Sequence, residues 1–217
     1  MVSIRSQKQL SVVLSRLKGF ETSKVSLEQY STDSNIAAFL LWNAALIDFI
    51  DDKTVLDLGC GTGILGLGAL FIDAEKVFFV DKDKDALNVL KENIKFIDEE
   101  LMKIPKKKYK IINKDVEKLN KKDVNKVKID IVIMNPPFGV QNEHADKEFL
   151  KVGFSTRKPV YSIHKVESRK FLEKFSADNG YKLTHFWEMD FPLKKTMKFH
   201  RKPVKKIRVC VCRFDSV

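Results

Sequence analysis

An amide, two prolines and an aromatic ring follow one another at residues 135–138, after a short apolar run. The side-chain oxygen of Asn135 and the carbonyl of Pro136 are two acceptors for the hydrogens of a planar amine, and Phe138 offers a ring on which a base can stack. Such an amine is a poor nucleophile because its lone pair is delocalised, and two acceptors draw it toward sp³ geometry. Pro136 and Pro137 hold the segment rigid. We call residues 135–138 the Asn-Pro-Pro-Phe segment and expect them to catalyse methylation of an amine such as N6 of adenine.

A second cluster lies at residues 57–63, where an aspartate leads three alternating glycines; we call it the glycine loop. Gly59, Gly61 and Gly63 let the backbone turn sharply and approach a nucleotide-like cofactor before a helix N-terminus. Nicotinamide enzymes use a similar turn with the spacing G-x-G-x-x-G, whereas this chain has G-x-G-x-G. The leading Asp57 favours S-adenosylmethionine, whose sulfonium and ammonium are cationic, because a carboxylate would repel a pyrophosphate.

Two further carboxylates follow the next two expected strands. Asp81 comes about 20 residues after the glycines, where an acid can accept both hydroxyls of a ribose. Asp115 follows the third strand and is placed to meet an adenine amine. Each acid also has a structural alternative: Asp57 as a helix cap, Asp81 as a loop carboxylate and Asp115 as a surface acid. Their shared position at strand ends favours cofactor binding.

The elements that position these residues are visible as an alternation of strand and helix patterns, which predicts a doubly wound α/β sheet. The β-rich runs are residues 54–58, 76–80, 109–113, 129–134 and 160–164. Helical patterns occupy residues 10–17, 36–49, 64–72, 83–97 and 167–179, with Asp33 or Ser34 as the cap of the second. Residues 182–191 and 207–214 predict an antiparallel pair that closes the sheet. Residues 139–159 have a loop-like composition and are a candidate lid over the substrate.

Length and composition fit one compact domain. The chain has 217 residues, of which 44% are hydrophobic, and its first twenty residues lack the apolar core of a signal peptide. Its three cysteines are too few for a disulfide framework or a four-ligand zinc site, so we predict no metal site and a cytoplasmic protein. We expect residues 1–50 to be a helical cap over the cofactor site and residues 51–217 to be the catalytic domain.

The net charge of +11 is concentrated near the end of the chain. Residues 194–208, the basic strip, contain eight lysines or arginines and no acid. Such a strip favours a polyanion, because each neutralised phosphate releases a counterion, although a solvated surface loop is the alternative. The residues expected to bind RNA are Lys194, Lys195, Lys198, Phe199, His200, Arg201, Lys202 and Lys205.

The chain resembles the class I S-adenosylmethionine-dependent methyltransferases, and the Asn-Pro-Pro-Phe segment resembles motif IV of their amino-methyltransferase branch. A closer resemblance joins Leu-Glu-Gln-Tyr-Ser-Thr at residues 27–32, Val-Tyr-Ser-Ile-His-Lys at 160–165 and Lys-Phe-His at 198–200. These motifs are similar to those of the methyltransferase-like protein 5 family of ribosomal RNA adenine-N6 methyltransferases. Serine at position 31 replaces a proline often seen there.

The resemblance implies a mostly parallel seven-stranded Rossmann-like sheet with a C-terminal antiparallel strand and helices on both faces. It adds Gln29, Tyr30 and Thr32 to the cofactor site. It also implies methylation of one adenosine in small-subunit ribosomal RNA, and a small zinc-containing activator subunit, with which the family's eukaryotic members pair.

Three alternatives stay open from the sequence. Asn-Pro-Pro-aromatic motifs also methylate glutamine side chains in proteins or adenine in DNA. A non-catalytic RNA-binding protein could retain the same fold, although the intact set of Asp57, Asp81 and Asn135 argues against it. A nicotinamide oxidoreductase is disfavoured by the glycine spacing.

Overall fold

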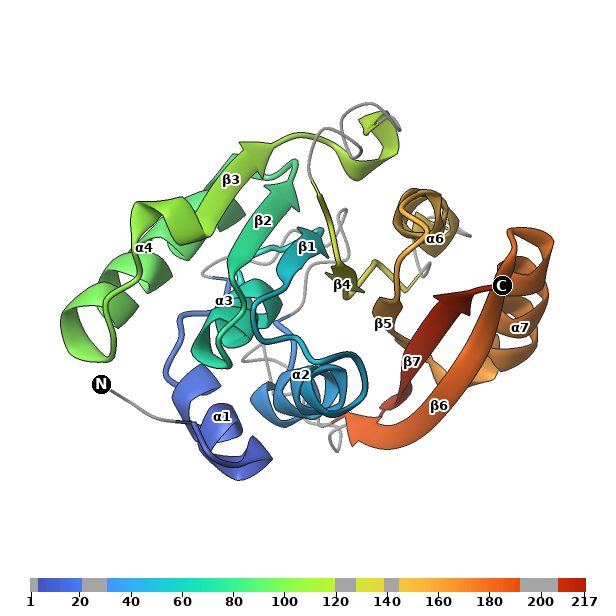
Figure 1. Ribbon diagram of the computed structural model, residues 1–217, viewed down its shortest axis with the longest axis horizontal. Helices are drawn as coiled ribbons and strands as arrows, with labels where there is room; N and C mark the ends of the chain where they lie inside the picture. The colour runs from blue at the N-terminus through green and yellow to red at the C-terminus, as the bar shows by residue number, and fades with distance from the viewer. Residues whose placement is uncertain (1–3, 21–30, 120–127, 139–144, 192–206) are drawn as a thin grey trace, which may run out of the picture.

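The structure is a computed structural model, and it describes residues 4–20, 31–119, 128–138, 145–191 and 207–217 (Figure 1). The strands are β1 (Thr54–Leu58), β2 (Lys76–Asp81), β3 (Tyr109–Asn113), β4 (Ile131–Met134), β5 (Val160–Lys165), β6 (Tyr181–Phe191) and β7 (Ile207–Ser216). The helices are α1 (Gln7–Leu14), α2 (Ser34–Asp48), α3 (Ile64–Phe71), α4 (Lys84–Glu100), α6 (Ala145–Ser155) and α7 (Arg169–Asp178). Short 3-10 turns lie at η2 (Lys106–Lys108), η3 (Val116–Lys118) and η4 (Val166–Ser168).

Within the described residues, seven strands form one sheet in the order β3-β2-β1-β4-β5-β7-β6. Strands β1 to β5 pair in parallel, and β7 lies antiparallel between β5 and β6. The chain winds in one direction from β1 to β3 and in the other from β4 to β5. A ligand site is therefore expected at the carboxyl ends of β1 and β4, where the winding reverses. The predicted α/β sheet with a C-terminal antiparallel strand is confirmed.

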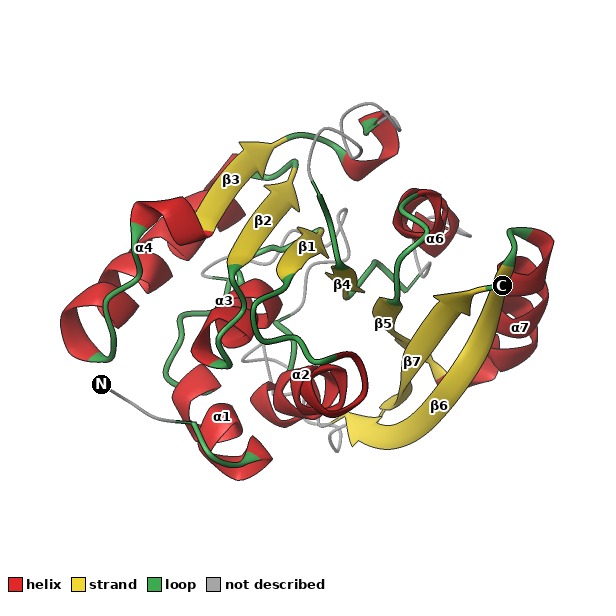
Figure 2. Cartoon of the chain, viewed as in Figure 1, coloured by secondary structure: helices red, strands yellow, loops and turns green. Residues whose placement is uncertain are grey.

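Helices cover both faces of the sheet, and each face has its own apolar cluster (Figure 2). Side chains of α1 to α4 form the first cluster with alternate residues of the central strands, and we call that side the N-terminal face. Helices α6 and α7 form the second cluster with the intervening strand residues. Strand residues therefore alternate between the two faces, which fixes where the polar side chains at the strand ends point. In the described parts of the chain, no helix is long and apolar enough to cross a membrane.

Side-chain caps set the starts of two helices that border the site. Asp33 accepts a hydrogen bond of 2.8 Å from the backbone N–H of Asn35 and begins α2, as the sequence predicts. Asp83 accepts 3.1 Å from the N–H of Asp85 and begins α4. Phe49 ends α2 in the left-handed conformation, with φ of 51°. The start of α2 follows Thr32, which contacts Asn135, and the start of α4 follows Asp81, which contacts Gly61.

A buried ion pair fastens α2 to the antiparallel part of the sheet. The Arg213 guanidinium on β7 donates to both carboxylate oxygens of Asp48, at 2.7 and 2.8 Å, and the hydroxyl of Tyr161 on β5 also donates to that carboxylate. Burial alone would raise the pKa of Asp48, but the hydrogen bonds from Arg213 and Tyr161 hold it below its usual range. The pair therefore holds the N-terminal helices against the sheet.

The expectation of a loop over residues 139–159 is wrong for most of that range. Residues 145–155 form α6, which packs its apolar side chains against the sheet. Gly153 hides the helical pattern because glycine is rare inside helices. A Cβ on Gly153 would lie 2.7 Å from the terminal methyl of Met134, so any larger residue there would displace the end of that side chain. Residues 139–144 lie outside the described parts of the chain.

Candidate active site

The carboxyl edge of the sheet brings the glycine loop, Asp81 and the Asn-Pro-Pro-Phe segment together. Asp57 and Asp81 lie in β1 and at the end of β2, which are paired, and Asn135 directly follows β4, the other neighbour of β1. Strand alternation directs Asp57 and Asn135 to the N-terminal face, where α2 and α3 pack. The acids and the amide that the sequence singles out therefore line one edge.

The glycine loop needs glycine for conformation and for space. Gly61 and Gly63 have φ of 52° and 91°, in the left-handed region that disfavours other residues. A Cβ on Gly61 would lie 2.9 Å from the Phe20 ring, and one on Gly59 would lie 2.6 Å from the Phe149 ring. Two aromatic rings therefore close on the loop, one from the segment after α1 and one from α6.

Asp57 is almost fully buried, with 1% of its surface exposed. Its Oδ2 accepts a hydrogen bond of 2.8 Å from the N–H of Gly66 in the first turn of α3. Its Oδ1 has no hydrogen-bond partner among the described residues. Oδ2 of Asp57 therefore caps α3, as the helix-cap alternative predicts, and Oδ1 remains available to a ligand. Burial raises the pKa of Asp57 to about 8, the Gly66 bond opposes the rise, and the nearby Asp81 adds to it. A cation beside Oδ1 would relieve this cost of ionisation.

Asp81 and Asp115 accept backbone hydrogen bonds. Asp81 accepts hydrogen bonds from the N–H groups of Gly61, at 2.7 Å, and Asp83, at 2.8 Å. Burial raises the pKa of Asp81, although these two hydrogen bonds oppose the rise. Each carboxylate oxygen keeps a further lone pair, so a ribose hydroxyl can still bind. Asp115 caps η3 through the N–H of Glu117, and its carboxylate lies 3.7 Å from the ammonium of Lys82. The structure thus keeps Asp81 beside the glycine loop and gives Asp115 a capping role at the neighbouring strand end.

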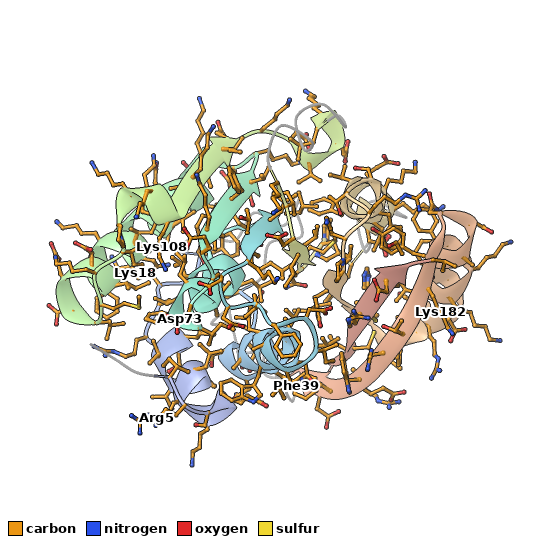
Figure 3. The ribbon with its side chains drawn as sticks, in the orientation of Figure 1. Arg5, Lys18, Phe39, Asp73, Lys108 and Lys182 are labelled. Carbon is orange, nitrogen blue, oxygen red and sulfur yellow. The ribbon has the colours of Figure 1, made fainter. Side chains whose placement is uncertain are left out.

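Asn93 is a site residue that the sequence did not reveal. Asn93 lies on α4, and it is 1% exposed. Its side chain accepts a hydrogen bond of 2.8 Å from the N–H of Lys18 and donates hydrogen bonds of 3.0 Å to the carbonyls of Lys18 and Thr62. Figure 3 shows Lys18 beside α4. This one amide therefore clamps the segment that carries Phe20 onto the glycine loop. An asparagine inside an amphipathic helix gives no sequence signal of such a contact.

The Asn-Pro-Pro-Phe segment holds Asn135 in a fixed orientation. Its Nδ2 donates 2.8 Å to Oγ1 of Thr32, the residue before the cap of α2. Its Oδ1 is buried and has no hydrogen-bond partner within the described residues. A buried unpartnered acceptor costs free energy, so a ligand that donates a hydrogen bond to it is favoured. Thr32, expected in the site from the resemblance, contacts the side-chain amide of Asn135.

Phe138 is half-buried and packs against the cluster of the N-terminal face. The ammonium of Lys165, the last residue of β5, lies 6.0 Å from the centroid of its ring. Lys165 was not singled out in the sequence, although it ends a motif that carries the resemblance.

A serine, a histidine and an aspartate also lie in line near this edge. Nε2 of His164 lies 2.7 Å from the hydroxyl of Ser162, and its Nδ1 lies 3.4 Å from the carboxylate of Asp146 on α6. Ser162 and His164 are 0% and 2% exposed, and the Ser162 hydroxyl is already hydrogen-bonded to the His164 ring. The set fastens the first turn of α6 to β5 rather than forming a nucleophile.

Several expected site residues lie outside the described parts of the chain. They are Gln29 and Tyr30 of the cofactor site and, in the basic strip, Lys194, Lys195, Lys198, Phe199, His200, Arg201, Lys202 and Lys205. Arg208, at the end of the strip, is described: it lies on β7 and pairs with Glu188 of β6. The free cysteines Cys60, Cys210 and Cys212 are buried, and the last two lie on β7, as the sequence predicts.

Comparison with known proteins gives matches along nearly the whole chain. The family model described as Conserved hypothetical protein 95 matches residues 34–157. The rRNA N(6)-adenosine-methyltransferase METTL5 of Danio rerio is 36% identical over 95% of this chain and 97% of that protein, and the Drosophila melanogaster protein of the same description is 30% identical over 96% and 95%. The crystal structure of PH1948 from Pyrococcus horikoshii is 42% identical, covers 99% of both chains and superposes with a TM-score of 0.85.

Proposed function

From its membership of the methyltransferase-like protein 5 family, within the class I methyltransferases, we propose that the chain methylates N6 of an adenosine in RNA. The chain also belongs to the Conserved hypothetical protein 95 family. The methyl donor is S-adenosylmethionine. The observation that carries the proposal is Asn135, whose Nδ2 is held by Thr32 while its buried Oδ1 lacks a partner. An acceptor fixed in this way suits the N–H of an amine.

The residues at the glycine loop fit the proposed cofactor. Gly59, Gly61 and Gly63 have left-handed φ values that let the loop turn sharply before α3, and Asp57 offers a buried oxygen without a partner among the described residues to a cationic group. Asp81 lies where a ribose would bind. Bound there, S-adenosylmethionine supplies an electrophilic methyl group on a sulfonium. We propose that residues 1–50 cover it, in keeping with the Asn93 clamp on the segment after α1.

The residues of the Asn-Pro-Pro-Phe segment act mainly by positioning. In the proposal, the target adenine leaves its stack and lies on Phe138, while Oδ1 of Asn135 and the carbonyl of Pro136 accept its N6 hydrogens. A carbon–nitrogen bond forms as the carbon–sulfur bond breaks, and the alkylated amine then loses one proton to solvent. No base with a tuned pKa is required before transfer, so geometry and electrostatics supply the catalysis.

We propose small-subunit ribosomal RNA as the finer target, since the relatives from zebrafish and fly are described as rRNA methyltransferases. We also propose a cytoplasmic location, the basic strip as the RNA-binding surface and a small zinc-containing activator as partner. The edge strand β3 is available for such a partner, since it pairs on one side only within the described residues. Co-purification from the native cell tests the partner independently of activity.

The experiment that tests the function is incubation of the protein with radiolabelled S-adenosylmethionine and, separately, with deproteinised unmethylated ribosomal RNA, duplex DNA and ribosomal protein. Nucleoside and amino-acid analysis then locates the label. N6-methyladenosine from RNA alone is the expected result. Label in DNA or in glutamine replaces the RNA proposal by the corresponding alternative. No label in any substrate, with or without a co-purified partner, refutes the enzymatic proposal.

A further inference from the structure

Lys165 ends β5 on the same face of the sheet as the Asn-Pro-Pro-Phe segment. Along β5, Tyr161 and Ile163 pack in the cluster of the N-terminal face, whereas His164 faces Asp146 of α6. Strand alternation therefore returns Lys165 to the N-terminal face. The strand lies next to β4, so a lysine at its carboxyl end is a direct neighbour of the segment that follows β4.

The ammonium of Lys165 lies beside an aromatic ring and, among the described residues, forms no ion pair with an acid. It lies 6.0 Å from the centroid of the Phe138 ring. In the described parts of the chain it forms no ion pair, although the protein has 29 acidic residues with which lysines such as Lys18 and Lys151 pair. A half-buried cation without a counter-charge, beside the ring on which the base is to stack, favours an anionic ligand there.

We propose that Lys165 is a phosphate-binding residue, which contacts a phosphodiester next to the target adenosine once its base lies on Phe138. This inference rests on the proposed function. A base covers the face of the ring on which it stacks, whereas the ammonium, 6.0 Å from the ring centroid, is at the outer limit of a cation–π contact. The base therefore displaces the ammonium from the ring, and the phosphate that arrives with the base gives the ammonium a stronger partner.

The chemistry of lysine fits this role. An ammonium binds phosphate as a point charge with three donors, and it needs no fixed bidentate geometry. Every nucleotide carries a phosphate, so the contact adds affinity and orientation without reading sequence. It would also make a nucleotide within a strand a better substrate than a glutamine side chain or a free nucleoside.

The test removes the charge from both sides of the contact. The substrate is a synthetic oligoribonucleotide that contains the adenosine methylated by the wild type, prepared with phosphates or with an uncharged methylphosphonate on either side of that adenosine. For the wild type, we expect one methylphosphonate position to lower kcat/KM about tenfold. Lys165→Gln should lower kcat/KM about tenfold on the unmodified strand. For this variant, the methylphosphonate should then lower kcat/KM by less than about a further twofold, because the contact is already lost.

Three controls separate contact from general damage. Lys165→Arg should restore most of kcat/KM, and the KM for S-adenosylmethionine should stay unchanged in both variants. Lys182→Gln removes an exposed lysine from β6, two strands from β5 in the sheet, and should leave the methylphosphonate effect intact (Figure 3). If the methylphosphonate lowers kcat/KM of Lys165→Gln by the same factor as that of the wild type, the two losses are independent and the inference is overturned. Absence of RNA methylation by the wild type would instead refute the proposed function.

Discussion

The two loops at the carboxyl edge of the sheet carry opposite electrostatic character. Around the glycine loop, Asp57 and Asp81 lie close together and are largely buried, and burial raises the pKa of both carboxyls. Around the Asn-Pro-Pro-Phe segment, the polar groups are the neutral acceptor of Asn135 and the ammonium of Lys165. The first half of the site favours a cation and the second a neutral donor joined to an anion. In the proposed function, the acidic half of this edge binds the cationic methyl donor and the other half binds the polyanionic substrate.

The largest expected effect tests the acidic half through pH. The pKa of Asp57 is about 8 when folded and about 3.9 when unfolded, so folding favours the protonated form. The stability that this proton provides is complete below about pH 4 and is lost as pH rises through about 8. Asp57 should thus lower the free energy of unfolding by up to about 1.4 kcal/mol per pH unit within that window. Urea unfolding between pH 4 and 9 measures the slope.

Asp57→Asn should flatten this profile, since asparagine keeps an acceptor for the Gly66 N–H and cannot ionise. The matched control is Asp51→Asn, at an exposed position outside the site. Equal pH profiles for Asp57→Asn and the wild type would show that the carboxyl ionises without cost and that the acidic half is not electrostatically strained.

The second prediction tests the neutral acceptor. Asn135→Ala removes Oδ1, so kcat for RNA methylation should fall about 100- to 1000-fold, the scale of losing one positioned hydrogen-bonding group at the reacting atom. Affinity for S-adenosylmethionine, measured by calorimetry, should change less than about twofold. Asn88→Ala, at an exposed asparagine of α4, is the control. Equal losses of cofactor affinity and kcat would make Asn135 a structural residue of both halves.

Most of the scaffold could be predicted because its signals are local. The runs that became β1 and β3 were predicted with their observed bounds, since β-branched, aromatic and other apolar residues predominate there. Helix α6 was missed because Gly153 interrupts its pattern, and only the structure shows how closely that glycine approaches Met134. Local patterns thus report strands and caps, but not the packing of one element against another.

The site was predictable only where chemistry lies in one segment. The Asn-Pro-Pro-Phe segment and the glycine loop can be recognised from the sequence, because their spacing and residue types alone indicate a ligand site. Asn93, by contrast, acts through Lys18, which is 75 residues away in sequence. The pair of Asp48 and Arg213 spans 165 residues. Such contacts depend on how the sheet folds the chain back, which a single sequence does not reveal.

The third prediction separates backbone strain from cofactor contact. Gly61→Ala places a Cβ at φ of 52° and 2.9 Å from the Phe20 ring, so it should cost about 1–3 kcal/mol of stability and weaken S-adenosylmethionine binding. Gly180→Ala is matched, because Gly180 has φ of 71° in the turn before β6, away from the glycine loop. It should lose similar stability with unchanged cofactor affinity. Thermal unfolding and calorimetry measure the two quantities, and an equal loss of affinity in both variants would remove Gly61 from the cofactor site.

The smallest expected effect concerns the contact between Thr32 and the side-chain amide of Asn135. Thr32→Val keeps the shape of the side chain but removes the acceptor for Nδ2 of Asn135, so the amide can rotate and its Oδ1 is no longer fixed. We expect kcat to fall about tenfold, equivalent to about 1.4 kcal/mol, with little change in stability. Thr32→Ser restores the hydroxyl and should recover most of the loss. If the serine variant is as slow as the valine variant, a hydroxyl at position 32 does not restore kcat, and the hydrogen bond from Nδ2 is not what orients Asn135. Thr32 would then contribute packing alone, and the orientation of Asn135 would be set by the two prolines that follow it.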